Sequence, residues 1–210
     1  MLSGKHGGSK VGISSIFEAV GKCLRGEITE EGLNRLERVA CPGVGSCNGL
    51  YTANTMACLT EAMGMSLPRA ATSLAVSSEK RALALETGIR IVHLIRKGIS
   101  ARKVMRKEAL ENAIVVDLAL GGSTNSVLHL MAIAKELDLP LDLDLFDELS
   151  EKVPQLCSLL PNGPYDMEDL HLAGGIPALM AELSEYLNLD VLTVTGKTLR
   201  ENLKGASVLN

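Results

Sequence analysis

A glycine-rich segment that leads directly into a helical segment is the feature that most constrains how this chain can fold. Residues 42–49 are PGVGSCNG, a composition that neither a regular helix nor a strand tolerates. Residues 52–63 are small and apolar and predict a helix, which Gly64 and Pro68 end. Cys47 is therefore expected on a loop just before a helix N-terminus, where the helix dipole and free backbone N–H groups favour a thiolate. We expect this loop to bind a ligand through Cys47.

The composition predicts a helix-rich core. The chain has 210 residues, enough for one sizeable domain or for a domain with part of a second. Aromatic residues make up 2% and Trp is absent, so aliphatic residues and Met must build the core, which favours close helix packing.

Charge and cysteine usage exclude several classes of protein. The net charge is −4 and no basic cluster stands out, which argues against a nucleic-acid partner. No apolar run approaches the roughly 20 residues that a membrane span needs, and the N-terminus lacks the apolar core of a signal peptide. Five cysteines at irregular spacing argue against a disulfide framework and indicate a reducing compartment, the cytoplasm or an organellar matrix in a eukaryote.

Helical periodicity and capping residues predict most of the secondary structure. The first 12 residues are expected to be a loop, because they are rich in Gly and Lys. Helices are predicted from Ser14 or Ser15 as N-cap to Gly26, over 29–40 with Thr29 as N-cap, and over 52–63. Further helices are predicted over 79–97 with Ser78 as N-cap and Gly98 as C-cap, from 100, over 127–137 and over 178–187. In the first helix, one apolar face is expected from Ile16, Val20, Cys23 and Leu24. In the helix over 79–97 we expect Leu83, Ile91, Leu94 and Ile95 to pack inward.

Three short segments are candidates for strands. Residues 113–116 are a buried-strand candidate, with a helix almost as well supported, and residues 141–149 alternate in part. Residues 190–195 (DVLTVT) have the β-branched composition of a strand, followed by a turn at Gly196.

A second glycine-rich loop precedes the apolar helix over 127–137. Gly121 and Gly122 are followed by Ser123, Thr124 and Asn125, which predicts a pocket for an oxyanion or a phosphate. The same three side chains could instead only cap the following helix.

The other candidate residues each have a structural alternative. Cys41 could be a second ligand beside Cys47, although their spacing fits no standard zinc motif. We expect Cys23, Cys58, Cys157 and His129 to pack in the core. Tyr51, Thr52 and Asn54 are expected either to support the Cys47 loop by hydrogen bonds or simply to pack.

Four segments, in order and in spacing, resemble the dihydroxy-acid and 6-phosphogluconate dehydratase family. They are GSCNGLYTANTMACLTEAMGMSLP at 45–68, LGGSTNSVLHLMAIAKEL at 120–137, PNGPYDMEDLHLAGGIPALMAEL at 161–183 and DVLTVTGKTLRENL at 190–203. The YTANTM segment resembles the dihydroxy-acid dehydratases more than their sugar-acid relatives, although the aldonate dehydratases share much of the pattern.

The resemblance implies a fold. We expect a helix-rich α/β chain in which residues 1–188 form part of a three-layer α/β/α N-terminal domain. Residues 189–210 would then begin a C-terminal β-barrel-like domain.

The resemblance also implies an iron–sulfur hydro-lyase that converts 2,3-dihydroxy acids into 2-keto acids in branched-chain amino-acid biosynthesis. In such enzymes three cysteines hold a 2Fe–2S or 4Fe–4S cluster, and the matching position here is Cys47. A Mg²⁺ ion assists, with ligands expected mostly outside this chain, and Ser123, Thr124 and Asn125 would line the site. The resemblance further implies a homodimer and an internal fragment that is inactive alone. The alternatives are a sugar-acid dehydratase and a non-catalytic, truncated helical module.

Overall fold

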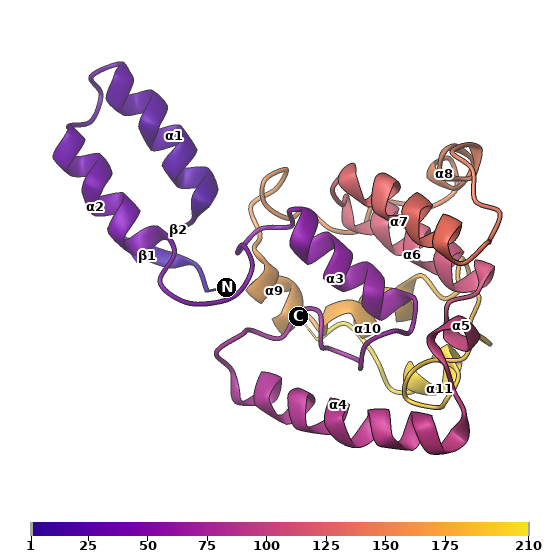
Figure 1. The fold of residues 1–210 in the computed structure, drawn as a ribbon. Helices are drawn as coiled ribbons and strands as arrows, with labels where there is room; N and C mark the ends of the chain where they lie inside the picture. Colours follow the sequence, from indigo (N-terminus) through magenta and orange to yellow (C-terminus); the bar gives the residue numbers. More distant parts are fainter. Residues whose placement is uncertain (1, 210) are drawn as a thin grey trace.

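Helices dominate the structure, a computed structural model that describes residues 2–209 (Figure 1). The described part of the chain contains one antiparallel hairpin, β1 (Gly4–His6) and β2 (Ser9–Val11), where the sequence predicted only a loop. The helices are α1 (Ile13–Leu24), α2 (Glu30–Ala40), α3 (Thr52–Ala62), α4 (Ser78–Lys97), α5 (Ala101–Val104), α6 (Lys107–Leu120), α7 (Asn125–Glu136), α8 (Asp144–Ser150), α9 (Met167–Leu172), α10 (Gly175–Glu182) and α11 (Leu199–Asn202). The helix-rich prediction is confirmed, whereas the three-layer arrangement and the β-barrel-like domain stay predictions.

Helix α6 lies at the centre of the core. Leu110 and Ile114 are fully buried, and α3, α7 and α8 pack around the helix. Residues 113–116 are thus part of a helix and not a strand. Within residues 109–120 every residue except Glu111 and Leu118 is buried, as expected for a helix that is surrounded on nearly all sides.

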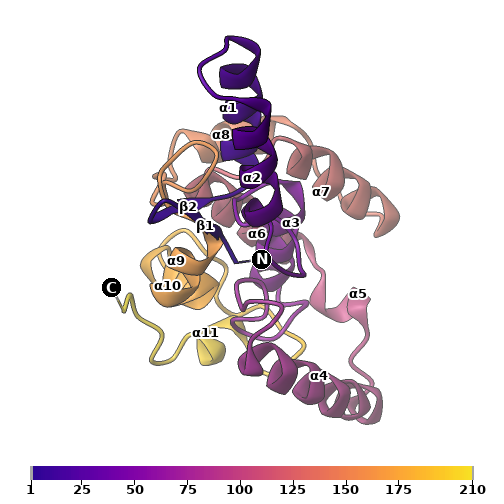
Figure 2. The same cartoon turned by 90° about the vertical axis from the view of Figure 1, so that its left-hand side faces the viewer.

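The hairpin, α1 and α2 form an N-terminal unit that projects from the rest of the molecule (Figures 1 and 2). Helix α1 begins at Ile13, one residue before the predicted cap, and the Gly12 N–H donates to Ser15 Oγ at 3.2 Å. In α2 the predicted N-cap is confirmed, because Thr29 Oγ1 accepts the Gly32 N–H at 3.1 Å. Leu24, on the predicted apolar face of α1, is 86% exposed.

Helix α4 runs along one edge of the body (Figure 1) and is rotated relative to the prediction. Leu94 is buried and Leu83 half-buried, but Ile91 and Ile95 are exposed. Arg90 lies on the same inward side of α4 as Leu83 and Leu94, and it donates to the Thr195 carbonyl oxygen at 3.2 Å. Ile91 and Ile95 each follow an inward residue by one position, about 100° around the helix, and therefore point outward. The predicted C-cap is confirmed, since Gly98 has a left-handed conformation.

The other two strand predictions are wrong. Residues 144–150 form α8, and the Asp142 carboxylate accepts the Leu145 N–H at its start. In segment 190–195 a single bridge joins Leu192 to Thr198, and the chain turns back at Gly196. β-branched composition alone does not make a strand, because a strand needs a neighbour to satisfy its backbone groups.

The chain after residue 188 packs on the same core as the helices before it. Leu199 of α11 is buried in that core, and the Val194 N–H donates to the Gly64 carbonyl oxygen at 2.8 Å. Helix α10 begins at Gly175 and ends at Glu182, earlier than predicted, because the left-handed Gly174 and Gly175 reverse the chain there. No helix within residues 2–209 is long and apolar enough to span a bilayer.

Candidate functional site

The Cys47 loop leads into the first turn of α3, as the sequence predicts. Cys47 is half-buried, whereas the loop before it, residues 41–46, is exposed. Its thiol lies 3.6 Å from Asn48 Oδ1. Asn54 of α3 is buried and donates from Nδ2 to the carbonyl oxygens of Cys47 and Gly49, both at 2.6 Å. Of the three residues predicted to support this loop, Asn54 does so, whereas the Tyr51 hydroxyl bonds to Ser14 and the Thr52 hydroxyl to the second loop.

The second glycine-rich loop meets the same turn of α3. Asn125 Nδ2 donates to Thr52 Oγ1 at 2.9 Å, and the hydroxyl oxygens of Thr52 and Ser123 are 3.0 Å apart. The Ser123 N–H also donates to Thr55 Oγ1 at 3.1 Å. Two loops that are far apart in sequence are thus joined through one helical turn.

This junction brings two helix N-termini together. Thr52 is the first residue of α3 and Asn125 is the first residue of α7, and their side chains are hydrogen-bonded. The positive ends of both helix dipoles therefore lie at this junction, which favours an anionic ligand there. Thr124 is exposed at the N-cap position of α7 and makes no capping hydrogen bond, so simple capping does not explain this side chain.

Asp117, a residue that sequence reasoning missed, lies behind the second loop. Its carboxylate is buried and accepts a hydrogen bond from Ser126 Oγ through Oδ2, while Oδ1 has no hydrogen-bond partner within the described residues. Burial raises the pKa of Asp117 to about 6. A Cβ on Gly122 would lie 1.9 Å from Asp117 Oδ1, so only glycine fits at that position. In the sequence, the pair Gly121–Gly122 was the only indication that another group, here the Asp117 carboxylate, lies close to this loop.

Asn48, next to Cys47, connects the loop to the N-terminal unit. Asn48 Nδ2 donates to Ser3 Oγ at 2.8 Å, and Ser3 Oγ donates to the buried Asp166 carboxylate at 2.6 Å. Lys10 lies 3.0 Å from the same carboxylate. Hydrogen bonds to Ser3 and Lys10 hold the pKa of Asp166 below its ordinary value, although its burial acts in the opposite direction. No local pattern in the sequence predicts these contacts between distant residues.

The four other cysteines differ from Cys47 in their surroundings. Cys58 is completely buried, and this burial raises the pKa of its thiol well above the ordinary value. Burial also raises the pKa of Cys157 to about 11, but Cys157 lies in an extended segment and not in a helix. Cys23 is only half-buried, contrary to the prediction of a core position, and Cys41 is exposed.

Two histidines lie in different surroundings. His129 is exposed on α7, not buried in the core as predicted. His171 lies with Nε2 2.9 Å from Glu79 Oε2 and Nδ1 3.0 Å from Thr72 Oγ1. Arg69 completes this polar group by an ion pair with Glu79 at 2.7 Å. The group joins α4 to α9 and lies apart from the residues predicted to form the site.

The side chains near the Cys47 loop could supply one ligand to a metal cluster, but they do not form a complete metal site. Within residues 2–209, no three His, Cys, Asp or Glu side chains come together in a way that could hold a metal ion. Cys47 offers one half-buried thiol on a glycine-containing loop that leads into the N-terminus of α3, a position in which a thiolate ligand is stabilised.

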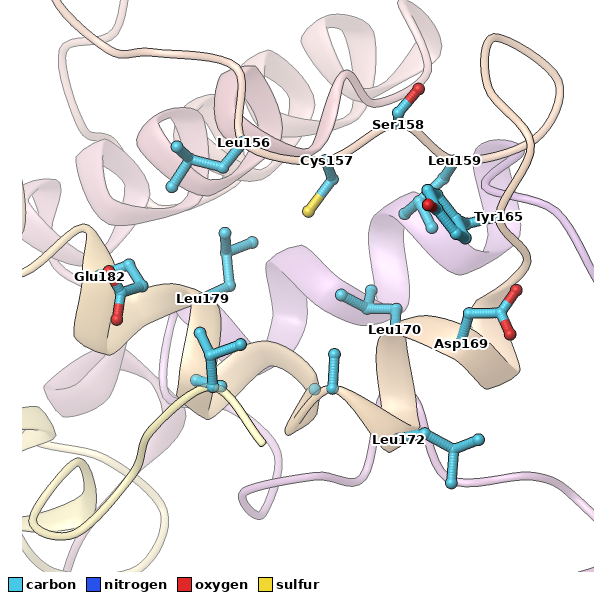
Figure 3. A pocket seen from close by; sticks show the side chains of 14 residues that line it. Leu156, Cys157, Ser158, Leu159, Tyr165, Asp169, Leu170, Leu172, Leu179 and Glu182 are labelled. Carbon is cyan, nitrogen blue, oxygen red and sulfur yellow. The ribbon is translucent and has the colours of Figure 1, made fainter. Parts of the chain in front are cut away.

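A cavity of about 670 Å³ lies elsewhere (Figure 3). Its wall is mainly aliphatic and includes Leu156, Leu170, Leu172 and Leu179, with Cys157 pointing into it. Cys47, Ser123, Thr124 and Asn125 do not line it. The cavity therefore gives no support to the predicted site, which rests on the junction of the two loops.

Comparison with known proteins identifies relatives over the whole chain. A family model described as dihydroxy-acid/6-phosphogluconate dehydratase N-terminal matches residues 1–202. The dihydroxy-acid dehydratase of Thermodesulfovibrio yellowstonii is 52% identical over 209 residues, which are 99% of this chain and 38% of that protein. The dihydroxy-acid dehydratase of Methanothermobacter thermautotrophicus is 51% identical over 209 residues, with the same two shares. The chain thus spans 38% of the length of these curated relatives.

Proposed function

The chain belongs to the dihydroxy-acid/6-phosphogluconate dehydratase family, and we propose that the whole protein is a hydro-lyase that dehydrates 2,3-dihydroxy carboxylic acids to 2-keto acids. Relatives about half identical to this chain carry the name dihydroxy-acid dehydratase, which favours a branched dihydroxy acid over a sugar acid. A typical substrate would be 2,3-dihydroxy-3-methylbutanoate, in branched-chain amino-acid biosynthesis. The protein would act in the cytoplasm or in an organellar matrix.

The junction of the two loops at the first turn of α3 carries this proposal. It joins the first turn of α3, into which the Cys47 loop leads, to Ser123 and Asn125, which are more than 70 residues further along the chain. We propose that Cys47 is one thiolate ligand of an iron–sulfur cluster, 2Fe–2S or 4Fe–4S. An iron of such a cluster supplies a Lewis acid for a departing hydroxyl group.

The chain's own residues would bind and orient the substrate. The two helix N-termini, of α3 and α7, favour the substrate carboxylate. Thr124 and Asn125 are exposed at that position and can offer hydrogen bonds. We assign the remaining cluster ligands and most ligands of a Mg²⁺ ion to segments other than residues 2–209, since no metal-binding group is found within them. A homodimer would cover the exposed apolar side chains of α1 and α4.

Turnover by the full-length protein tests the substrate class. Protein prepared without oxygen and supplied with Mg²⁺ is expected to form a 2-keto acid from 2,3-dihydroxy-3-methylbutanoate much faster than from 6-phosphogluconate. Faster turnover of the sugar acid would favour the sugar-acid dehydratase instead. Turnover of neither compound by protein that carries iron and sulfide would favour the non-catalytic module.

A further inference from the structure

Asn54 uses its whole side-chain amide to hold the Cys47 loop. Nδ2 donates to the carbonyl oxygens of Cys47 and Gly49, both at 2.6 Å, and Oδ1 accepts from Ser46 Oγ at 2.5 Å. Both partners of Nδ2 are carbonyl oxygens, which can only accept, so the amide has one possible orientation. Asn54 itself is 5% exposed and lies in the first turn of α3.

These hydrogen bonds hold the backbone or side chains of residues on both sides of Cys47. Ser46 and Gly49 are fixed to the same amide as the Cys47 backbone, so the loop cannot turn about Cys47 without breaking at least two of them. Beyond Gly49 the chain is fixed again, because the Leu50 N–H donates to the Leu160 carbonyl oxygen at 2.7 Å. Before Ser46 the loop is exposed. Asn54 thus connects the exposed stretch of the loop to the first turn of α3.

We propose that Asn54 is a positioning residue that holds the Cys47 thiol in its ligand-binding direction before any ligand is bound. The identity of that ligand rests on the function proposed above, but the positioning role does not. Preorganisation of this kind lowers the entropy that a ligand must remove from the loop on binding. A residue that supports a ligand from behind in this way commonly affects metal affinity without touching the metal.

Substitutions at Asn54 and Ser46 separate the two hydrogen bonds that the Asn54 amide donates from the one that it accepts. Asn54→Asp keeps an acceptor for Ser46 but replaces the donor with an oxygen that faces two carbonyl oxygens. Ser46→Ala leaves both carbonyl bonds in place. Asn34→Asp makes the same chemical change at an exposed position of α2 and serves as the matched control.

The experiment measures cysteine alkylation in full-length protein from which metal has been removed by chelation. Iodoacetamide labelling is followed for each cysteine by mass spectrometry, and the exposed Cys41 of the same chain is the internal reference. We expect Asn54→Asp to raise the ratio of the Cys47 rate to the Cys41 rate about fivefold, because breaking two buried hydrogen bonds frees the loop. Ser46→Ala should change the ratio less than twofold, and Asn34→Asp should leave it unchanged. A purely structural role would alter overall stability without changing this ratio.

A second variant and a second measurement keep the proposal falsifiable. Should Asn54→Asp fail to fold, Asn54→Ser removes the same two bonds with a smaller, neutral side chain and should raise the ratio in the same direction. An unchanged ratio in a folded Asn54 variant overturns the proposal. Iron and sulfide in protein that has not been stripped, with the visible absorption of the cluster, should fall in the Asn54 variants and not in Asn34→Asp. If wild-type protein carries no iron while the alkylation ratio still rises, the positioning role stands and the proposed cluster function fails.

Discussion

At the scale of single residues, Asp117 shows how burial sets the behaviour of the site. Its carboxyl group lies in the core against Gly122, one oxygen has no hydrogen-bond partner within the described residues, and its pKa is raised to about 6 from an ordinary 3.8. The folded chain therefore keeps this proton at pH values where the unfolded chain has lost it. The stabilisation is fully present below pH 3.8, decreases as the pH rises, and is lost above about pH 6.

Asp117→Asn should remove this pH dependence. The asparagine oxygen can still accept the Ser126 hydroxyl, and the side chain cannot ionise. We expect the variant to exceed wild type in unfolding free energy by about 2 kcal/mol near pH 8 and to differ little near pH 4. Urea denaturation at the two pH values measures this. Because Glu61, whose pKa is raised by burial to about 7, titrates in the same direction, only the difference between variant and wild type at each pH isolates Asp117. A constant difference at both pH values would show that Asp117 does not titrate as described.

The sequence could indicate Cys47 but not Asp117. Cys47 stands out because local glycines and a following helix are visible in a few residues. From the sequence alone, Asp117 cannot be distinguished from a carboxylate on an exposed helix face. Its burial follows from the packing of α3, α7 and α8 around α6, which is a long-range property.

At the scale of elements, local signals determined which predictions succeeded. Helix α3 begins and ends close to its predicted limits, and Gly98 closes α4 in the predicted left-handed conformation, because caps and glycines act within one turn. The strand predictions over 113–116, 141–149 and 190–195 failed, because a strand depends on a partner that the local sequence cannot supply.

The start of α4 gives a test at this scale. The Lys80 N–H donates to Ser77 Oγ at 3.1 Å, so Ser77 is the N-cap and the predicted Ser78 is the first helical residue. Ser77→Ala is expected to lower the free energy of unfolding by about 1 kcal/mol, whereas Ser78→Ala should change it by less than about half that amount. Thermal or urea denaturation of the two variants side by side measures the difference. A larger loss for Ser78→Ala would place the start of the helix one residue later.

At the scale of the whole molecule, contacts between distant segments assemble the site. Thr52 and Ser123 are 71 residues apart, and Ser3 and Asp166 are 163 residues apart. The N-terminal unit meets the body near the Cys47 loop, because Asn48 bonds to Ser3 and because the hydroxyl groups of Ser14 and Tyr51 are 2.7 Å apart. The sequence motifs singled out the two loops that carry the proposed site residues, and only the fold shows that α3 is the element bonded to both loops.

The most direct test of this account measures iron and acid-labile sulfide in the full-length protein prepared without oxygen. Wild type is compared with Cys47→Ser and with Cys41→Ser, the exposed cysteine at the start of the same loop. We expect a cluster in wild type and in Cys41→Ser, and loss of most iron and sulfide in Cys47→Ser, because replacing the thiolate removes one ligand. A cluster that survives Cys47→Ser would contradict the central claim that this loop holds it.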